Sequence, residues 1–159
     1  MSHDRMIEFS FKGPVDPEER ATAEDLYSQE LDEFCDWIDD TNPAEREKEL
    51  RELRRRLPEV LFASTDKPDE FVWLGMNKKL ISGWKEKLHR QVDAINEDCL
   101  AGRRELDRSL NEILDGLLFF SPGGYDRPMT STRFLADAVA YEIKPGDHVW
   151  IGGIIDYHY

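Results

Sequence analysis

The sequence has little of what usually marks a small secreted, membrane or metal-binding protein. Only two of its 159 residues are cysteines, Cys35 and Cys99, and neither belongs to a C-x-x-C pair, so neither a disulfide framework nor a zinc cluster is expected. The longest apolar block, residues 113–120, is interrupted by Asp115 and is far shorter than the about 18 residues that span a bilayer. The N-terminal residues lack the charged and then apolar blocks of a signal peptide. We therefore expect a cytoplasmic protein with two free, buried thiols.

Sequence motifs that would indicate a reaction are also missing. There is no G-x-S-x-G sequence, and the glycines of the Ser121–Pro128 loop are not followed by the Lys-Ser/Thr of a phosphate cradle. Asp156 and His158 share a face of a predicted strand, but His148 would lie about 33 Å from His158, since a straight strand rises about 3.3 Å per residue. We expect no catalytic residue, no metal and no cofactor, and thus a protein that is not an enzyme.

Basic residues are scarce relative to acidic ones. The chain has 21 lysines and arginines against 34 aspartates and glutamates, which gives a formal net charge of −13. A field of this sign repels nucleic-acid phosphates and attracts basic surfaces. The most basic run, residues 51–56, is short and embedded among glutamates, so direct nucleic-acid binding is not expected, nor is binding to a membrane.

The excess negative charge is concentrated in residues 16–40, which hold eleven carboxylates and a single base, Arg20. Asp16 followed by Pro17 is typical of a helix start, and apolar residues recur every three or four positions, which predicts one long helix over Asp16–Asp40. This apolar stripe consists of Tyr27, Leu31, Phe34, Cys35 and Ile38. Like charges one turn apart cost a few tenths of a kcal/mol per pair. Because the chain tolerates this cost, we predict that the acidic segment is a binding surface. The alternative is that it is only a solvated outer face.

Trp37 lies at the border of that stripe, where it fits either a core edge or an interface anchor surrounded by acids. The predicted partner-binding residues share the C-terminal half of the acidic segment and are Glu30, Asp32, Glu33, Asp36, Trp37, Asp39 and Asp40.

Hydrophobic periodicity predicts the remaining elements. The expected helices are Ala44–Leu57, a third that is capped by Asn77, and a fourth over Leu106–Leu118. The expected strands are Met6–Phe11, Phe71–Leu74, Ala138–Ile143 and Val149–Tyr159. The last two should form a β-hairpin, with a bulge at Gly152-Gly153 that lets Val149, Ile151, Ile154 and Ile155 all reach the core. The predicted fold is one compact α+β domain, residues 1–159, with about four helices packed on a small, mostly antiparallel sheet.

The function predicted from charge and size is that of an acidic, non-enzymatic protein that occupies a basic protein surface. The preferred setting is an inhibitor of a nucleic-acid-handling protein, of the anti-defence type, in which carboxylates stand in for phosphates. An immunity protein against a basic nuclease toxin is the second. A small enzyme or ligand-binding domain is the alternative from another class. Its site would lie between the Ser121–Pro128 loop and the C-terminal hairpin, and a pocket joining Tyr125, Asp126 and His148 would favour it. A subunit that forms a homodimer through the third helix or the last strand is a further alternative.

Overall fold

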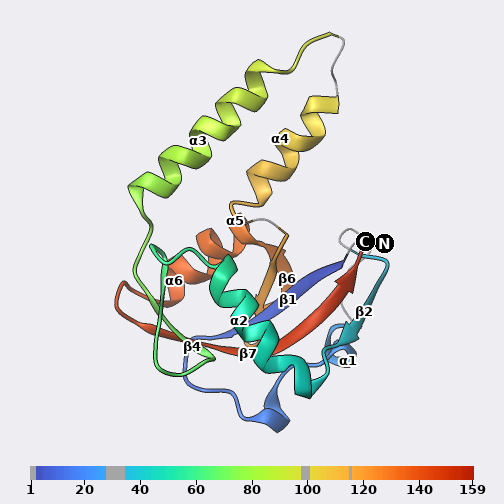
Figure 1. The fold of residues 1–159 in the computed structure, drawn as a ribbon, viewed down its shortest axis with the longest axis vertical. Coiled ribbons are helices and arrows are strands. Elements are labelled where there is room, and N and C mark those ends of the chain that lie inside the picture. The colour runs from blue at the N-terminus through green and yellow to red at the C-terminus, as the bar shows by residue number, and fades with distance from the viewer. Residues whose placement is uncertain (1–2, 28–34, 98–100, 115) are drawn as a thin grey trace.

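The computed structural model in Figure 1 describes residues 3–27, 35–97, 101–114 and 116–159. It confirms the α+β class. The sheet has seven strands, more than the four expected. They are β1 (His3–Ser10), β2 (Trp37–Asp40), β3 (Phe62–Ser64), β4 (Glu70–Trp73), β5 (Leu118–Ser121), β6 (Tyr125–Thr130) and β7 (His148–His158). Their order is β3-β4-β7-β1-β5-β6, with β2 also paired to β7, and the sheet is mixed because β1 and β5 run parallel.

The long strand β7 organises this sheet. It pairs with β1 along one edge, and along the other it pairs with β4 near its start and with β2 near its end. The predicted hairpin between Ala138–Ile143 and the last strand is therefore wrong. Residues 131–142 are instead helical, as α5 (Ser131–Phe134), the π-helical η3 (Leu135–Val139) and α6 (Ala140–Glu142). Buried positions 134, 135, 138 and 139 recur with a helical period, which strand alternation does not give, and the alanines of this segment also favour the helix.

The predicted β-bulge in the last strand is confirmed. Ile7 of β1 lies opposite Ile154 of β7, whereas Phe9 lies opposite Ile151, so β7 uses one residue more than β1 between these pairs. Ile151 and Ile154 consequently belong to the same core cluster, and Val149 and Ile155 are also buried. The extra residue lies at Gly152-Gly153, as the sequence indicated.

The predicted helix over Asp16–Asp40 is wrong in the part that the structure describes. The segment contains the short 3-10 helix η1 (Pro17–Glu19), the single-turn helix α1 (Ala23–Leu26) and strand β2. Leu26 and Ile38 instead pack with Tyr157 on one face of the sheet. Pairing with β7 satisfies backbone groups along that strand without stacking like charges one turn apart.

Both cysteines were expected on helices. Cys35 instead lies just before β2, outside any helix, where it is half-buried, and Cys99 lies outside the described residues.

The second and third predicted helices are confirmed, and the fourth is shorter than expected. They are α2 (Arg46–Arg56, preceded by the 3-10 turn η2, Pro43–Glu45), α3 (Lys78–Asp93, capped by the Asn77 side chain) and α4 (Ala101–Asn111). A helix cannot run on to Leu118 because Gly116 has a φ of +78°. The apolar run after it forms β5, which is buried between β1 and β6.

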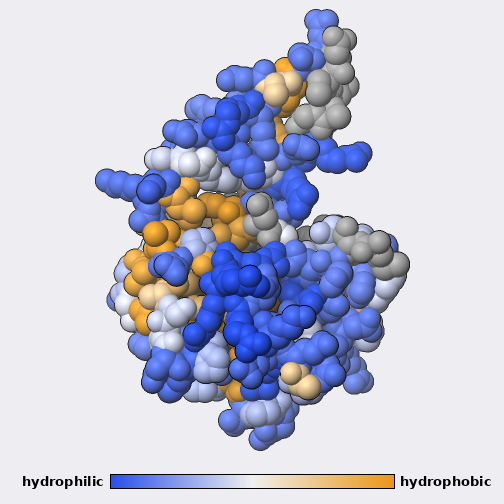
Figure 2. Space-filling model, in the orientation of Figure 1, coloured by the Kyte–Doolittle hydropathy of each residue, from blue (hydrophilic) through white to orange (hydrophobic). Residues whose placement is uncertain are grey.

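The expected hairpin of α3 and α4 forms, and it projects from the sheet (Figure 1). None of the residues of α3 is fully buried, so its apolar stripe serves mainly this hairpin. Figure 2 shows hydrophobic residues concentrated where the hairpin meets the body of the molecule, on an otherwise largely hydrophilic face. The main core lies on the α2 side of the sheet, and a smaller cluster lies on the opposite side beneath α1 and β2.

Candidate partner-binding surface

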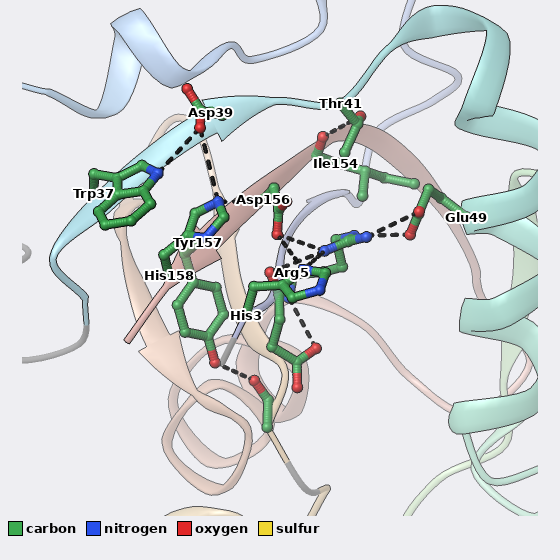
Figure 3. A network of polar contacts seen from close by, with 12 residues as sticks. His3, Arg5, Trp37, Asp39, Thr41, Glu49, Ile154, Asp156, Tyr157 and His158 are labelled. Carbon is green, nitrogen blue, oxygen red and sulfur yellow. Dashed lines mark hydrogen bonds and ion pairs between the residues drawn. The ribbon is translucent and has the colours of Figure 1, made fainter. Parts of the chain in front are cut away.

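Three adjacent strands display a row of stacked rings near the N-terminal end of β1. Trp37 of β2 lies opposite His158 of β7, which lies opposite His3 of β1. The ring centroids of Trp37 and His158 are 4.4 Å apart, and the two ring planes are nearly parallel, with 18° between them. His158 also stacks on His3, with 5.7 Å between the ring centroids. Directly opposed residues in antiparallel strands share a face and bring their side chains together, which explains the stack in Figure 3.

A second row of charged side chains lies two residues further along the same strands. Arg5 of β1 is opposite Asp156 of β7, which is opposite Asp39 of β2. The Arg5 guanidinium donates to Asp156 over 2.5 Å and makes two further bonds, of 2.8 and 3.0 Å, to Glu49 of α2. The hydrogen bond with Glu49 raises the pKa of Arg5 and lowers the pKa of Glu49. The helix is thereby fixed to the sheet, and two carboxylates bind one guanidinium.

Carboxylates also hold the Trp37–His158 pair in place. His158 Nε2 lies 3.6 Å from Asp156 and 3.7 Å from Asp39, and the Trp37 indole donates to Asp39 over 3.2 Å. Trp37 is nevertheless 40% exposed. We call Trp37, Asp39, His158 and His3 the Trp37 surface, and the exposed Asp36 precedes it in the sequence. This surface offers an exposed aromatic ring beside the Asp39 carboxylate.

The structure describes eight of the eleven carboxylates in residues 16–40, and all eight are exposed. Within the described residues, none of these eight forms an ion pair with a lysine or arginine. This differs from α2, where Arg51 pairs with Glu47 and Arg55 pairs with Glu52. Arg56 of the same helix binds Asp4 of β1.

Four of the seven predicted partner-binding residues are described. Trp37 and Asp39 lie together on the Trp37 surface, on strand β2 rather than on a helix, and Asp36 is exposed just before that strand. Asp40 is exposed, but its carboxylate accepts a hydrogen bond from the Ala23 amide over 2.6 Å at the start of α1, so it has a structural role. Glu30, Asp32 and Glu33 lie outside the described residues.

Sequence reasoning missed His3, Arg5 and Glu49 as neighbours of Trp37. It did place Asp156 and His158 on one face, and the structure confirms that placement. The matching alternation of His3 with Arg5 could have indicated the adjacent strand, but only the register shows which residues meet. Across the described ranges, no group of three or more His, Cys, Asp or Glu side chains could hold a metal ion.

A cavity does lie beside the predicted 121–128 loop, but it does not bring together the side chains predicted for a site there. Tyr125–Thr130 is strand β6, so the loop is reduced to residues 122–124. The three side chains named for that site do not converge. His148 is bonded to Glu70 of β4 at 2.8 Å, and Asp126 accepts a bond from the Gly123 amide within its own turn, while Tyr125 lines a separate cavity.

No helix in the described part of the chain combines the length and apolar character that crossing a membrane requires. No protein-family model matches this chain, and neither a curated protein nor a solved structure shows significant similarity to it.

Proposed function

We propose that this chain is an acidic, non-enzymatic binding protein whose Trp37 surface docks on a basic surface of a partner protein. The observation that carries the proposal is an exposed tryptophan that stacks on His158 and bonds to Asp39, a carboxylate with no lysine or arginine partner in the described chain. Tryptophan is enriched among the residues that dominate binding energy, and a ring already stacked on His158 loses little conformational freedom on binding.

The chemistry of the surface defines the partner. Guanidinium and ammonium groups bind carboxylates by charge-assisted hydrogen bonds and also stack on tryptophan. Nucleic acid would instead be repelled by the same carboxylates. A partner that itself binds nucleic acid has a basic surface of this kind, so we propose an inhibitor of a nucleic-acid-handling protein. An immunity protein against a basic nuclease uses the same chemistry and is the second candidate.

Site-specific crosslinking tests the location of the binding surface. Asp36 is replaced by a photoreactive benzoylphenylalanine in source cells, and Glu86 on α3, which is also exposed, is replaced in the control. We expect position 36 to yield an adduct with a basic, nucleic-acid-binding protein, identified by mass spectrometry, and position 86 to yield none. Equal adducts at both positions, or an acidic partner at position 36, would contradict the proposal.

Titration with the purified partner then tests the anchor. Trp37→Ala should weaken affinity by about 30-fold or more, the usual scale for an anchoring aromatic. Tyr141→Ala, which removes an aromatic ring that is 83% exposed on α6, should leave affinity unchanged. Unaltered affinity of the Trp37 variant would rule out the Trp37 surface.

Competition with duplex DNA separates the two settings. If the carboxylates replace phosphates, DNA and this chain should exclude each other from the partner. An immunity protein that binds beside the nuclease's nucleic-acid site should abolish cleavage while DNA remains bound.

A further inference from the structure

A cavity of about 410 Å³ lies at the opposite end of β1 from the Trp37 surface. Ser10 and Phe11 at the end of β1, and Ser121 and Pro122 at the end of β5, contribute to its wall. Because β1 and β5 run parallel and are adjacent, their carboxyl ends open side by side into this space. Crevices outside the carboxyl ends of such strands are common ligand sites, and the volume lies within the usual range for them.

Glu8 lines this cavity, and one of its two carboxylate oxygens accepts hydrogen bonds from the backbone. Its side chain is 97% buried, as the residue is 3% exposed. Oε2 accepts hydrogen bonds from the Ala21 amide over 2.7 Å and the Gly153 amide over 3.3 Å, whereas Oε1 accepts none. Burial raises the pKa of Glu8, because desolvation outweighs these two bonds. Oε1 is not among the buried side-chain atoms that lack a partner in the described residues, so it is accessible and can accept a hydrogen bond from a ligand in the cavity.

The glycines of the bulge make room for this carboxylate. A Cβ at Gly152 would overlap Glu8 Oε1, and one at Gly153 would overlap the Ala21 carbonyl oxygen. The amide of Gly153 needs only one acceptor, which Oε2 supplies. An amide side chain could meet that structural need equally well, so the fold does not require the second carboxylate oxygen.

The charges around Glu8 favour a cation. Glu19 and Glu142 also line the cavity, and Lys12 is the single basic residue in its described lining. The three glutamates and this lysine together carry a formal charge of −2. The positive charge of Arg46, whose guanidinium donates to the carbonyl oxygens of Ile151 and Gly152, offsets part of this negative potential at Glu8. Asp25 adds further negative potential at Glu8.

Aromatic side chains complete the wall. Phe11 and Tyr125 both line the cavity, and the Tyr125 hydroxyl donates to Glu142 over 3.3 Å. Rings beside carboxylates are the combination that binds alkylammonium and guanidinium groups, through cation–π attraction together with charge-assisted hydrogen bonds.

We propose that this cavity binds a small organic cation, with an ammonium or guanidinium group donating to Glu8 Oε1. The cation is either a free amine or an arginine or lysine side chain of a peptide. The proposal does not depend on the function assigned to the Trp37 surface.

Calorimetric titration with defined probes tests this site. The probes are 1,4-diaminobutane, agmatine and N-acetyl-arginine amide, with 1,4-butanediol as the uncharged counterpart of the first. We expect at least one cationic probe to bind and the diol not to bind. Binding of the free amines alone would assign a metabolite, and binding of the blocked arginine would assign a peptide side chain. No binding by any cation at millimolar concentration, or equal binding of the diol, would overturn the proposal.

Variants locate the bound cation. Glu8→Gln keeps an oxygen for the Ala21 and Gly153 amides but removes the charge, and it should weaken binding about tenfold or more. Glu24→Gln, an exposed change on α1, is the matched control and should have no effect. If Glu8→Gln does not fold by circular dichroism, the rim pair Glu19→Gln and Glu142→Gln, both exposed, should weaken binding instead. Full affinity in a folded Glu8 variant, or in the rim variant, would place the cation elsewhere.

Discussion

At the scale of single residues, Arg5 connects parts of the chain that are far apart in the sequence. Its side chain binds Asp156, which is 151 positions away on β7, and Glu49, which is 44 positions away on α2. The Arg5 and Glu49 side chains are 20% and 11% exposed, so water screens their bidentate pair only partly. Removing one partner would leave the other largely buried without its counter-charge.

We predict that Glu49→Gln lowers the free energy of unfolding at neutral pH by about 1.5–3 kcal/mol, the range for hydrogen bonds to charged groups. Because the pKa of Glu49 is lowered from its ordinary value of 4.5, this stabilisation is present above that value and is lost as pH falls through the folded-state pKa. Urea unfolding at several pH values measures the difference. Glu47→Gln, which breaks the exposed pair with Arg51, should cost less than about 1 kcal/mol. A Glu49 variant as stable as the wild type at neutral pH would contradict this role.

At the scale of elements, the bulge in β7 determines how the sheet is filled. It allows isoleucines three positions apart to enter the same core, and it frees the Gly153 amide to bond with Glu8. On the other edge of β7, between its pairings with β4 and β2, side chains replace a strand. The carbonyls of Ile151 and Gly152 accept from Arg46, and that of Ile154 accepts from Thr41. The bulge is therefore satisfied from both sides.

We predict that Gly152→Ala destabilises the fold by about 1–3 kcal/mol, the usual cost of overpacking a buried site. The added Cβ would displace the Glu8 carboxylate, and with it the acceptor of two backbone amides. Gly13→Ala is the matched control, since a Cβ there meets nothing within 4 Å. Thermal and urea unfolding compare the two variants. Equal midpoints would show that the space above Gly152 is not needed.

At the scale of the molecule, charge is distributed unevenly. The segment from residue 16 to residue 40 has eleven carboxylates and one arginine, whereas α3 has five lysines and arginines against two acids. The projecting hairpin is therefore basic on α3. The described carboxylates of residues 16–40 are exposed to solvent elsewhere on the molecule. Such a separation of charge orients an approaching partner before contact.

We predict that reversing Asp36 and Asp39 to lysine slows association with a basic partner at low salt, with the difference from wild type shrinking as salt is added. The reason is that salt already screens the wild-type attraction. Stopped-flow association rates at several ionic strengths measure this. Glu59→Lys with Asp66→Lys, two exposed changes outside the acidic segment, forms the control and should have a smaller effect. The same salt dependence in both double variants would show that net charge alone is responsible.

The sequence by itself determined the elements whose signals are local. Alternation predicted β1, β4 and β7, helical spacing with capping residues predicted α2 and α3, and Gly152-Gly153 indicated the bulge. These predictions succeeded because periodicity, capping and backbone freedom depend on nearby residues. The composition likewise identified an acidic segment, and the carboxylates that the structure describes there are exposed.

Only the tertiary structure decided where ambiguous segments belong. Residues 37–40 fit a helical stripe, yet the open edge of β7 pairs with them as a strand. Residues 138–142 fit a strand, yet they are helical. The stack of Trp37, His158 and His3, like the contact of Glu8 with the bulge, joins residues more than a hundred positions apart. Such contacts depend on strand order and register, which are set by burial across the whole sheet rather than by any local pattern.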